Sequence, residues 1–178
     1  MKKFLGLIVS LTIIAAVCAA LLAYINVKTA EPIKKAAAEK RILMAKAVMP
    51  SIVVSIDEED GFFIGKDASG SVAGFALEGS DMGGYGGEIV LMVGFEADKK
   101  TVVAYKNLKS SETPGLGSKL QTPEFSGQFE GKDVSLLKLK KDGGEIDAIT
   151  AATITSRAVC KAVADAEAKL QKYRKVTY

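Results

Sequence analysis

A chain of 178 residues can bury the core of one domain and add an anchor, but it is too short for two catalytic domains of ordinary size. Its net charge of +3 is small and its lysines are scattered among acidic residues, so we expect no nucleic-acid partner. The sequence has no histidine, which excludes Ser-His-Asp triads, His-ligated zinc and the usual general base at neutral pH. Any chemistry is therefore expected to come from a bound cofactor, and no metal site is predicted.

Residues 4–24 form an uncharged apolar stretch that follows two lysines. A helix rises 1.5 Å per residue, so this stretch covers the roughly 30 Å hydrocarbon core of a bilayer. A cleavable signal peptide is the alternative, because Cys18-Ala19-Ala20 resembles a small-residue cleavage site, but the apolar run continues past that point. We predict a transmembrane anchor over residues 1–28, with membrane lipid as its surroundings.

Residues 29–50 are predicted to form a helical stalk between the anchor and a domain. Thr29 can cap a helix with Pro32 in its first turn, and the helical spacing of apolar residues lasts until Pro50. The basic face of the stalk is interpreted as a solvated surface or a contact with lipid headgroups. Counting lysines on the two sides of the anchor favours a cytoplasmic location for the C-terminal side.

From residue 51 the pattern changes to the alternation that is typical of strands, with glycine, aspartate and asparagine at the turns. Strands are predicted at 51–56, 61–64, 71–77, 88–96, 101–107, 134–139 and 145–149. A helix over 156–173 follows, with one apolar face. The expected fold class of the domain at 51–178 is α+β, a mostly antiparallel sheet with a C-terminal helix.

Two short segments resemble sites only superficially. The acidic run at 57–60 lacks the alternating ligand spacing of a calcium loop, so we predict an exposed hairpin turn. The glycine-rich run at 83–87 precedes a strand instead of opening a helix, which is the wrong context for a dinucleotide fingerprint. It is also predicted to be a turn.

A third segment, residues 147–156, runs from the end of a predicted strand into the last helix. Its small residues allow a ligand to approach the backbone closely, and the N–H groups and dipole of the helix start favour an anion. A phosphate on or beside Thr153 would be well placed there. The alternative is that Thr155 and Ser156 simply cap the helix while the alanines fill space. Spacing alone favours this second interpretation.

The same segment resembles the acceptor motif of covalent FMN-binding domains, Asp-x-x-Ser/Thr-Gly-Ala-Thr, in which a flavin transferase joins FMN by a phosphoester to the last threonine. Asp147 matches the leading acid and Thr150 the hydroxyl position. Ala152 matches the alanine and Thr153 the acceptor. Ala151 replaces the glycine, and a positive φ at this position would strain an alanine. The resemblance implies covalent FMN on Thr153, with Thr150, Ala151 and Ala152 cradling its phosphate.

A second motif, residues 109–117, resembles the Glu-Thr-Pro-Gly-Leu-Gly segment of the same domains, which lies against the flavin. Taken alone, it describes a tight turn in which proline presets φ and glycine is free to adopt a positive φ. Two matched motifs in one chain are much harder to obtain by chance. The resemblance implies that the isoalloxazine ring is contacted or supported by Glu112, Thr113, Leu116 and Gly117.

Together with the N-terminal anchor and the segments 84–87 and 140–144, these motifs resemble the G subunits of Rnf electron-transport complexes. The resemblance implies an electron carrier in a ferredoxin:NAD+ oxidoreductase coupled to Na+ or H+ translocation, partnered by the other subunits and, during maturation, by the flavin transferase. It also implies a single-pass protein of the cell inner membrane with its flavin domain on the extracytoplasmic side, against the lysine count.

Three alternatives come from related or different classes. The C subunits of sodium-translocating NADH:quinone oxidoreductases share the flavin domain but are usually longer. A membrane-anchored flavin reductase would need its own substrate pocket with acid or base groups. An assembly scaffold would carry no cofactor, and flavin colour that survives denaturation would exclude it.

Overall fold

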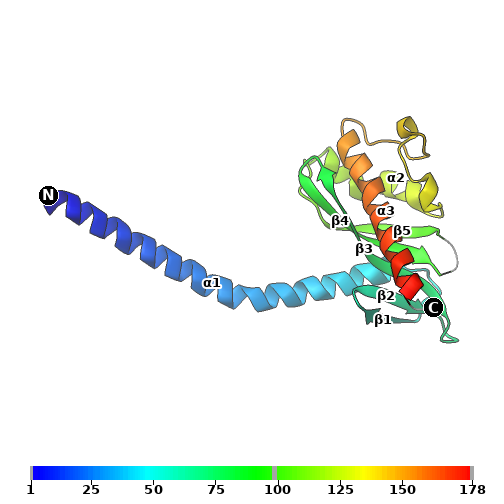
Figure 1. The fold of residues 1–178 in the computed structure, drawn as a ribbon, viewed down its shortest axis with the longest axis horizontal. Helices are drawn as coiled ribbons and strands as arrows, with labels where there is room; N and C mark the ends of the chain where they lie inside the picture. The colour runs from blue at the N-terminus through cyan, green and yellow to red at the C-terminus, as the bar shows by residue number, and fades with distance from the viewer. Residues whose placement is uncertain (1, 98–99, 177–178) are drawn as a thin grey trace. The chain divides into compact units, whose positions relative to one another are not determined.

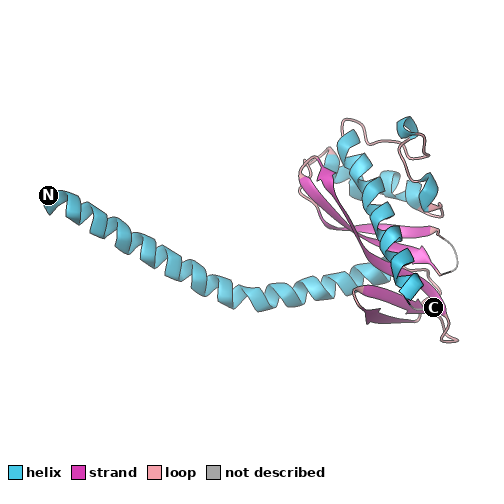
Figure 2. Cartoon of the chain, in the orientation of Figure 1, coloured by secondary structure: helices cyan, strands magenta, loops and turns pink. Residues whose placement is uncertain are grey.

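The computed structural model describes residues 2–97 and 100–176 (Figures 1 and 2). It divides into two compact units, Met1–Lys40 and Arg41–Tyr178. The division lies within one long helix, α1 (Lys2–Val48), so that the last turns of this helix belong to the second unit.

All the described residues of the first unit are helical. The apolar part of α1 is long enough to cross a membrane, and none of its side chains in that window is buried. The helix does not begin anew at Thr29, whose hydroxyl donates to the carbonyl of Ile25 (2.9 Å) as a side chain inside a helix does. The predicted cap at Thr29 is therefore wrong. Extending an existing helix by one residue costs less than nucleating another, and Pro32 is accommodated within α1.

The second unit is built on a five-stranded meander. Each strand pairs antiparallel with the next along the chain, in the order β1-β2-β3-β4-β5. The strands are β1 (Ser55–Glu59), β2 (Phe62–Lys66), β3 (Val72–Gly84), β4 (Gly87–Glu96) and β5 (Val102–Lys109). Together with the C-terminal helix α3 (Thr153–Val176), they confirm the predicted α+β class with a mostly antiparallel sheet.

Both faces of the sheet are covered. Helix α3 packs against β3 and β4 over one face, as Figure 1 shows. Side chains alternate along a strand, so Leu91 and Val93 point to this face while Met92 points to the other. On that second face, the end of α1 buries Ala45 and Val48.

Both helices approach the sheet at glycines. A Cβ at Gly79 would lie 2.0 Å from the carbonyl oxygen of Ala162 in α3. A Cβ at Gly94 would lie 1.8 Å from the carbonyl oxygen of Val48 in α1. Each helix backbone therefore rests directly on the backbone of a strand.

The predicted strands at 134–139 and 145–149 are wrong. This region contains two short 3-10 turns, η3 (Val134–Leu136) and η4 (Lys140–Asp142), and a single bridge between Leu139 and Ile146. The alternation has another cause, because Leu137, Leu139 and Ile146 point into the core from an irregular chain. Between β5 and this region lie η1 (Gly117–Gln121), α2 (Pro123–Ser126) and η2 (Gly127–Phe129).

The two turns predicted from charged and glycine-rich runs form hairpins. The acidic run contributes three residues to β1 before the chain turns at Asp60, whose φ is 49°. The glycine-rich run pairs Gly84 with Gly87 and places its turn between them. Helix α3 begins at Thr153, three residues earlier than the predicted 156.

Candidate functional site

A cavity of about 470 Å³ lies at the N-terminal end of α3. Three segments form its wall: the β3–β4 turn, the loop after β5, and the turn that leads into α3. It is lined by Tyr85, Glu112, Thr113, Leu116, Gly117, Ala151, Ala152, Thr153, Ile154 and Thr155. The fold thus brings the two sequence motifs, which are separated along the chain, to a single hollow.

The Glu112 carboxylate connects all three segments. Its Oε2 accepts a hydrogen bond from the Thr155 hydroxyl (2.6 Å), and its Oε1 accepts one from the N–H of Gly86 (3.2 Å). A Cβ at Gly117 would lie 2.4 Å from Oε2, so only glycine leaves room for this carboxylate. The motif residues Glu112 and Gly117 are therefore matched to each other.

The turn that leads into α3 is held by Ser156, which is fully buried. Its hydroxyl accepts from the N–H of Ile149 (2.9 Å) and donates to the carbonyl of Ala152 (2.9 Å). The N–H of Ala152 also donates to the Ile149 carbonyl (2.9 Å). Neither Thr155 nor Ser156 acts as the simple helix cap considered above, because their hydroxyls bind Glu112 and the turn.

Ala151, at the centre of this turn, has φ = 62°. This left-handed conformation is costly for any residue with a Cβ and nearly free for glycine. The position therefore does require the positive φ for which the motif uses glycine. The chain tolerates alanine because the bonds to Ser156 on both sides impose the turn.

Thr153 is the first residue of α3 and lines the cavity. Its side chain is half-buried, and its hydroxyl has no hydrogen-bond partner among the described residues. The first N–H groups of an α-helix have no helical carbonyl to bind, and the helix dipole adds partial positive charge there. The hydroxyl thus lies where an attached phosphate would be stabilised.

Asp147 and Thr150 lie outside this cavity, in a smaller hollow of about 140 Å³ on the other side of the turn. The Asp147 carboxylate binds Nζ of Lys140 (2.7 Å). Its N–H donates to Oε1 of Gln128 (2.7 Å), and its carbonyl accepts from Nε2 of the same side chain (3.4 Å). Asp147 therefore holds this end of the turn, whereas Thr150 is exposed and only lines the smaller hollow.

Exposed apolar side chains surround the mouth of the cavity: Tyr85 is 71% exposed, Ile154 50% and Leu116 41%. Apolar surface gathered at a hollow is typical of a site that a ligand covers. The sequence analysis missed Tyr85 and Ile154, although both adjoin matched motif residues. It also missed Gln128, which no local pattern marks.

Comparisons with known proteins match both the domain and most of the chain. The family model described as "FMN-binding domain" matches residues 84–168, which include both motifs. The chain is 37% identical over 173 residues to the G subunit of an "Ion-translocating oxidoreductase complex" of Methanosarcina acetivorans, covering 91% of this chain and 92% of that one. It is 32% identical over 183 residues to the G subunit of the "Na(+)-translocating ferredoxin:NAD(+) oxidoreductase complex" of Acetobacterium woodii, covering 89% and 86%. Among solved structures, Shewanella oneidensis NqrC aligns with a TM-score of 0.48 and 22% identity over 67% of this chain and 65% of that one.

Proposed function

The chain belongs to the family of G subunits of ion-translocating oxidoreductase complexes, and from this premise we propose that it carries FMN joined by a phosphoester to Thr153. It is an electron-carrier subunit of such an oxidoreductase and contains an FMN-binding domain. The observation that carries the proposal is the half-buried Thr153 hydroxyl at a helix N-terminus, unpaired among the described residues and lining a cavity built from both flavin motifs.

The residues that line the cavity fit an FMN group. The start of α3 receives the phosphate, and the small side chains of Ala151 and Ala152 leave the backbone accessible to it. Tyr85, Leu116 and Ile154 supply the apolar surface that a planar ring would cover. When bound, FMN supplies the electron transfer, while the chain binds it and sets its surroundings.

The other motif residues hold the walls of the flavin cavity at their spacing. Glu112 ties the β5 loop to α3 and to the β3–β4 turn, and Thr113 and Gly117 flank it at the cavity wall. Asp147 supports the acceptor turn through its bonds to Lys140 and Gln128, and Thr150 lines the neighbouring hollow. A covalent link suits this arrangement, because a tethered carrier stays in place between electron transfers without needing high affinity.

We also propose that the complex is a ferredoxin:NAD+ oxidoreductase coupled to Na+ or H+ transport. The relative from Acetobacterium woodii carries that activity in its name, with Na+ as the ion.

The flavin domain would lie outside the cytoplasm, anchored by α1, and would receive its FMN there from a flavin transferase. The lysine count favours the opposite side, but folded domains can translocate despite flanking lysines, so it does not exclude this location.

In-gel flavin fluorescence of the denatured full-length protein, produced together with a flavin transferase, tests the attachment. The band should fluoresce after denaturation, and mass mapping should find FMN on the peptide that contains Thr153. A folded protein whose flavin is lost entirely on denaturation would refute the covalent link.

A further inference from the structure

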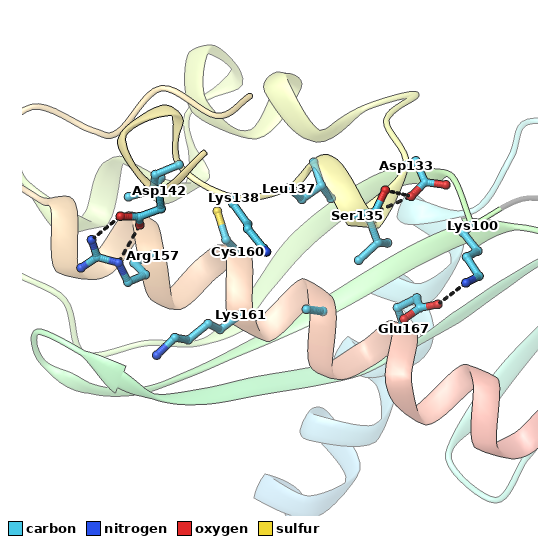
Figure 3. Close-up of a pocket in the computed structure, with 13 residues that line it drawn as sticks. Lys100, Asp133, Ser135, Leu137, Lys138, Asp142, Arg157, Cys160, Lys161 and Glu167 are labelled. Atoms are coloured by element: carbon cyan, nitrogen blue, oxygen red, sulfur yellow. Dashed lines mark hydrogen bonds and ion pairs between the residues drawn. The ribbon is translucent and has the colours of Figure 1, made fainter. Parts of the chain in front are cut away.

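A second cavity of about 530 Å³ lies further along α3 and contains none of the flavin-motif residues. One wall is α3, and the other is the irregular segment that carries η3 and η4, as Figure 3 shows. We call this hollow the α3 groove. It is lined by Lys100, Asp133, Val134, Ser135, Leu137, Lys138, Leu139, Asp142, Arg157, Cys160, Lys161, Ala164 and Glu167.

The floor of the α3 groove is apolar. Leu137, Leu139 and Cys160 form it and are at most 5% exposed. Burial raises the pKa of the Cys160 thiol to about 12, so this group is neutral at physiological pH. Ala164 has the smallest side chain on the helix wall and leaves the groove open above the floor.

An ion pair closes each end of the groove. Nε of Arg157 binds the Asp142 carboxylate (2.8 Å), and Nζ of Lys100 lies 3.8 Å from Glu167. The third acid, Asp133, accepts hydrogen bonds from the N–H and hydroxyl of Ser135. Every carboxylate that lines the groove is therefore already engaged.

Two lysines of the groove, in contrast to these carboxylates, are available to bind a partner. Lys138 on the irregular segment and Lys161 on α3 both line the groove and are exposed. Neither Nζ has an ion-pair or hydrogen-bond partner among the described residues, and no dashed line reaches either residue in Figure 3. The groove thus combines an apolar floor, closed ends and available positive charge from both walls.

We propose that the α3 groove docks a segment of another subunit of the complex, in which one large apolar side chain is flanked by carboxylates. This inference rests on the proposed function, which makes the chain one subunit of an assembly. The apolar side chain would occupy the groove and lie on its apolar floor, and its acidic neighbours would pair with Lys138 and Lys161. A buried anchor surrounded by complementary charge is the usual form of a stable contact between proteins.

Charge reversal in the assembled complex tests the proposal. Lys138→Glu with Lys161→Glu should lower the amount of the other subunits that co-purify with the tagged full-length chain to about a tenth of wild type, because two attractions become repulsions. The matched control is Lys46→Glu with Lys172→Glu, which makes the same charge change at exposed lysines outside the groove. Equal recovery with both double variants would overturn the proposal.

Photo-cross-linking identifies the occupant. A benzoylphenylalanine at position 164 should cross-link one other subunit, through a peptide that contains a large apolar residue beside an aspartate or glutamate. The same group at Ala168, exposed on α3 outside the groove, should not. Cross-linking to a second copy of the chain, to an acid-free peptide or to no subunit would refute the assignment.

The flavin provides an independent readout. In-gel fluorescence of the charge-reversal variant should equal that of wild type, because neither lysine lines the flavin cavity. Unchanged fluorescence with unchanged co-purification would sink the docking proposal and leave the proposed function standing. Native mass spectrometry that finds a small anion lost on charge reversal, without loss of subunits, would also count against docking.

Discussion

The Thr155 hydroxyl donates a 2.6 Å hydrogen bond to Oε2 of Glu112, a residue 43 positions earlier in the chain. This bond joins the first turn of α3 to the loop after β5, and Thr155 is only 1% exposed. Because the other oxygen of Glu112 receives the N–H of Gly86, a single carboxylate sets the spacing of three cavity walls. Removing this carboxylate should therefore change both the free energy of unfolding and the absorption spectrum of the bound flavin.

Glu112→Ala should lower the free energy of unfolding by about 1–3 kcal/mol, because the buried Thr155 hydroxyl loses its acceptor. Covalent FMN should remain, since Glu112 does not contact the attachment atom, but the visible absorption spectrum of the flavin should shift. Urea unfolding and absorption spectroscopy measure the two effects. Leu116→Ala is the companion variant, with a spectral shift and a smaller stability loss; loss of FMN from both folded variants would assign this loop to transferase recognition instead.

Thr153→Ala should abolish covalent FMN and leave the fold intact, because the Thr153 hydroxyl has no bond to lose within the described residues. Thr153→Ser keeps the oxygen and should retain partial attachment. In-gel fluorescence after production with a flavin transferase measures attachment, with circular dichroism as the folding control. Thr150→Ala is the matched control and should stay fluorescent; a dark Thr150→Ala beside a fluorescent Thr153→Ala would move the acceptor.

Ala151→Gly should stabilise the protein by about 1 kcal/mol, because it relieves a left-handed alanine whose φ is 62°. Ala148→Gly is the control: it is exposed in the same turn region, has no positive φ, and should lower stability through added freedom in the unfolded chain. Denaturant midpoints compare the two. A loss of stability in both variants would contradict the strain assigned to Ala151.

Removing residues 1–28 should give a soluble protein, because the apolar part of α1 is lost while its last turns remain. Removing residues 1–50 should cost about 3 kcal/mol or more, because Val48 and Met49 no longer cover Phe63 and Met92. Solubility and thermal unfolding of the two shortened chains provide the measurements. Equal stability of both would show that residues 29–50 contribute nothing to the packing on this face of the sheet.

The flavin domain should be cleaved by protease added outside cells whose outer barriers have been removed. The expected result follows from the proposed extracytoplasmic location, with a cytoplasmic protein as the control for membrane integrity. Resistance until the membrane is broken would place the domain in the cytoplasm, as the lysine count suggests.

The fold class and the C-terminal helix could be predicted from strand alternation and helical spacing. Most residues of the cavity lining were identified through the resemblance to covalent FMN-binding domains, because spacing alone favoured a simple turn and a helix cap. The strands at 134–139 and 145–149 were misassigned because buried Leu137 and Leu139 alternate with exposed residues even without a sheet partner. Gln128 escaped notice because its pairing with Asp147 is a long-range contact of one side chain. Asp147 itself supports the turn from behind, a placement that depends on tertiary packing.

The two glycines on which the helices rest, Gly79 and Gly94, limit which substitutions this fold can accept. At Gly79 and Gly94 any side chain would collide with a carbonyl oxygen of α3 or α1, and a backbone atom cannot rotate away as a side chain can. Gly127, in contrast, has φ = −63° and open space where a Cβ would lie, so other residues can take its place. In a saturation mutagenesis library selected for folded protein, Gly79 and Gly94 should be recovered almost unchanged, while Gly127 should vary.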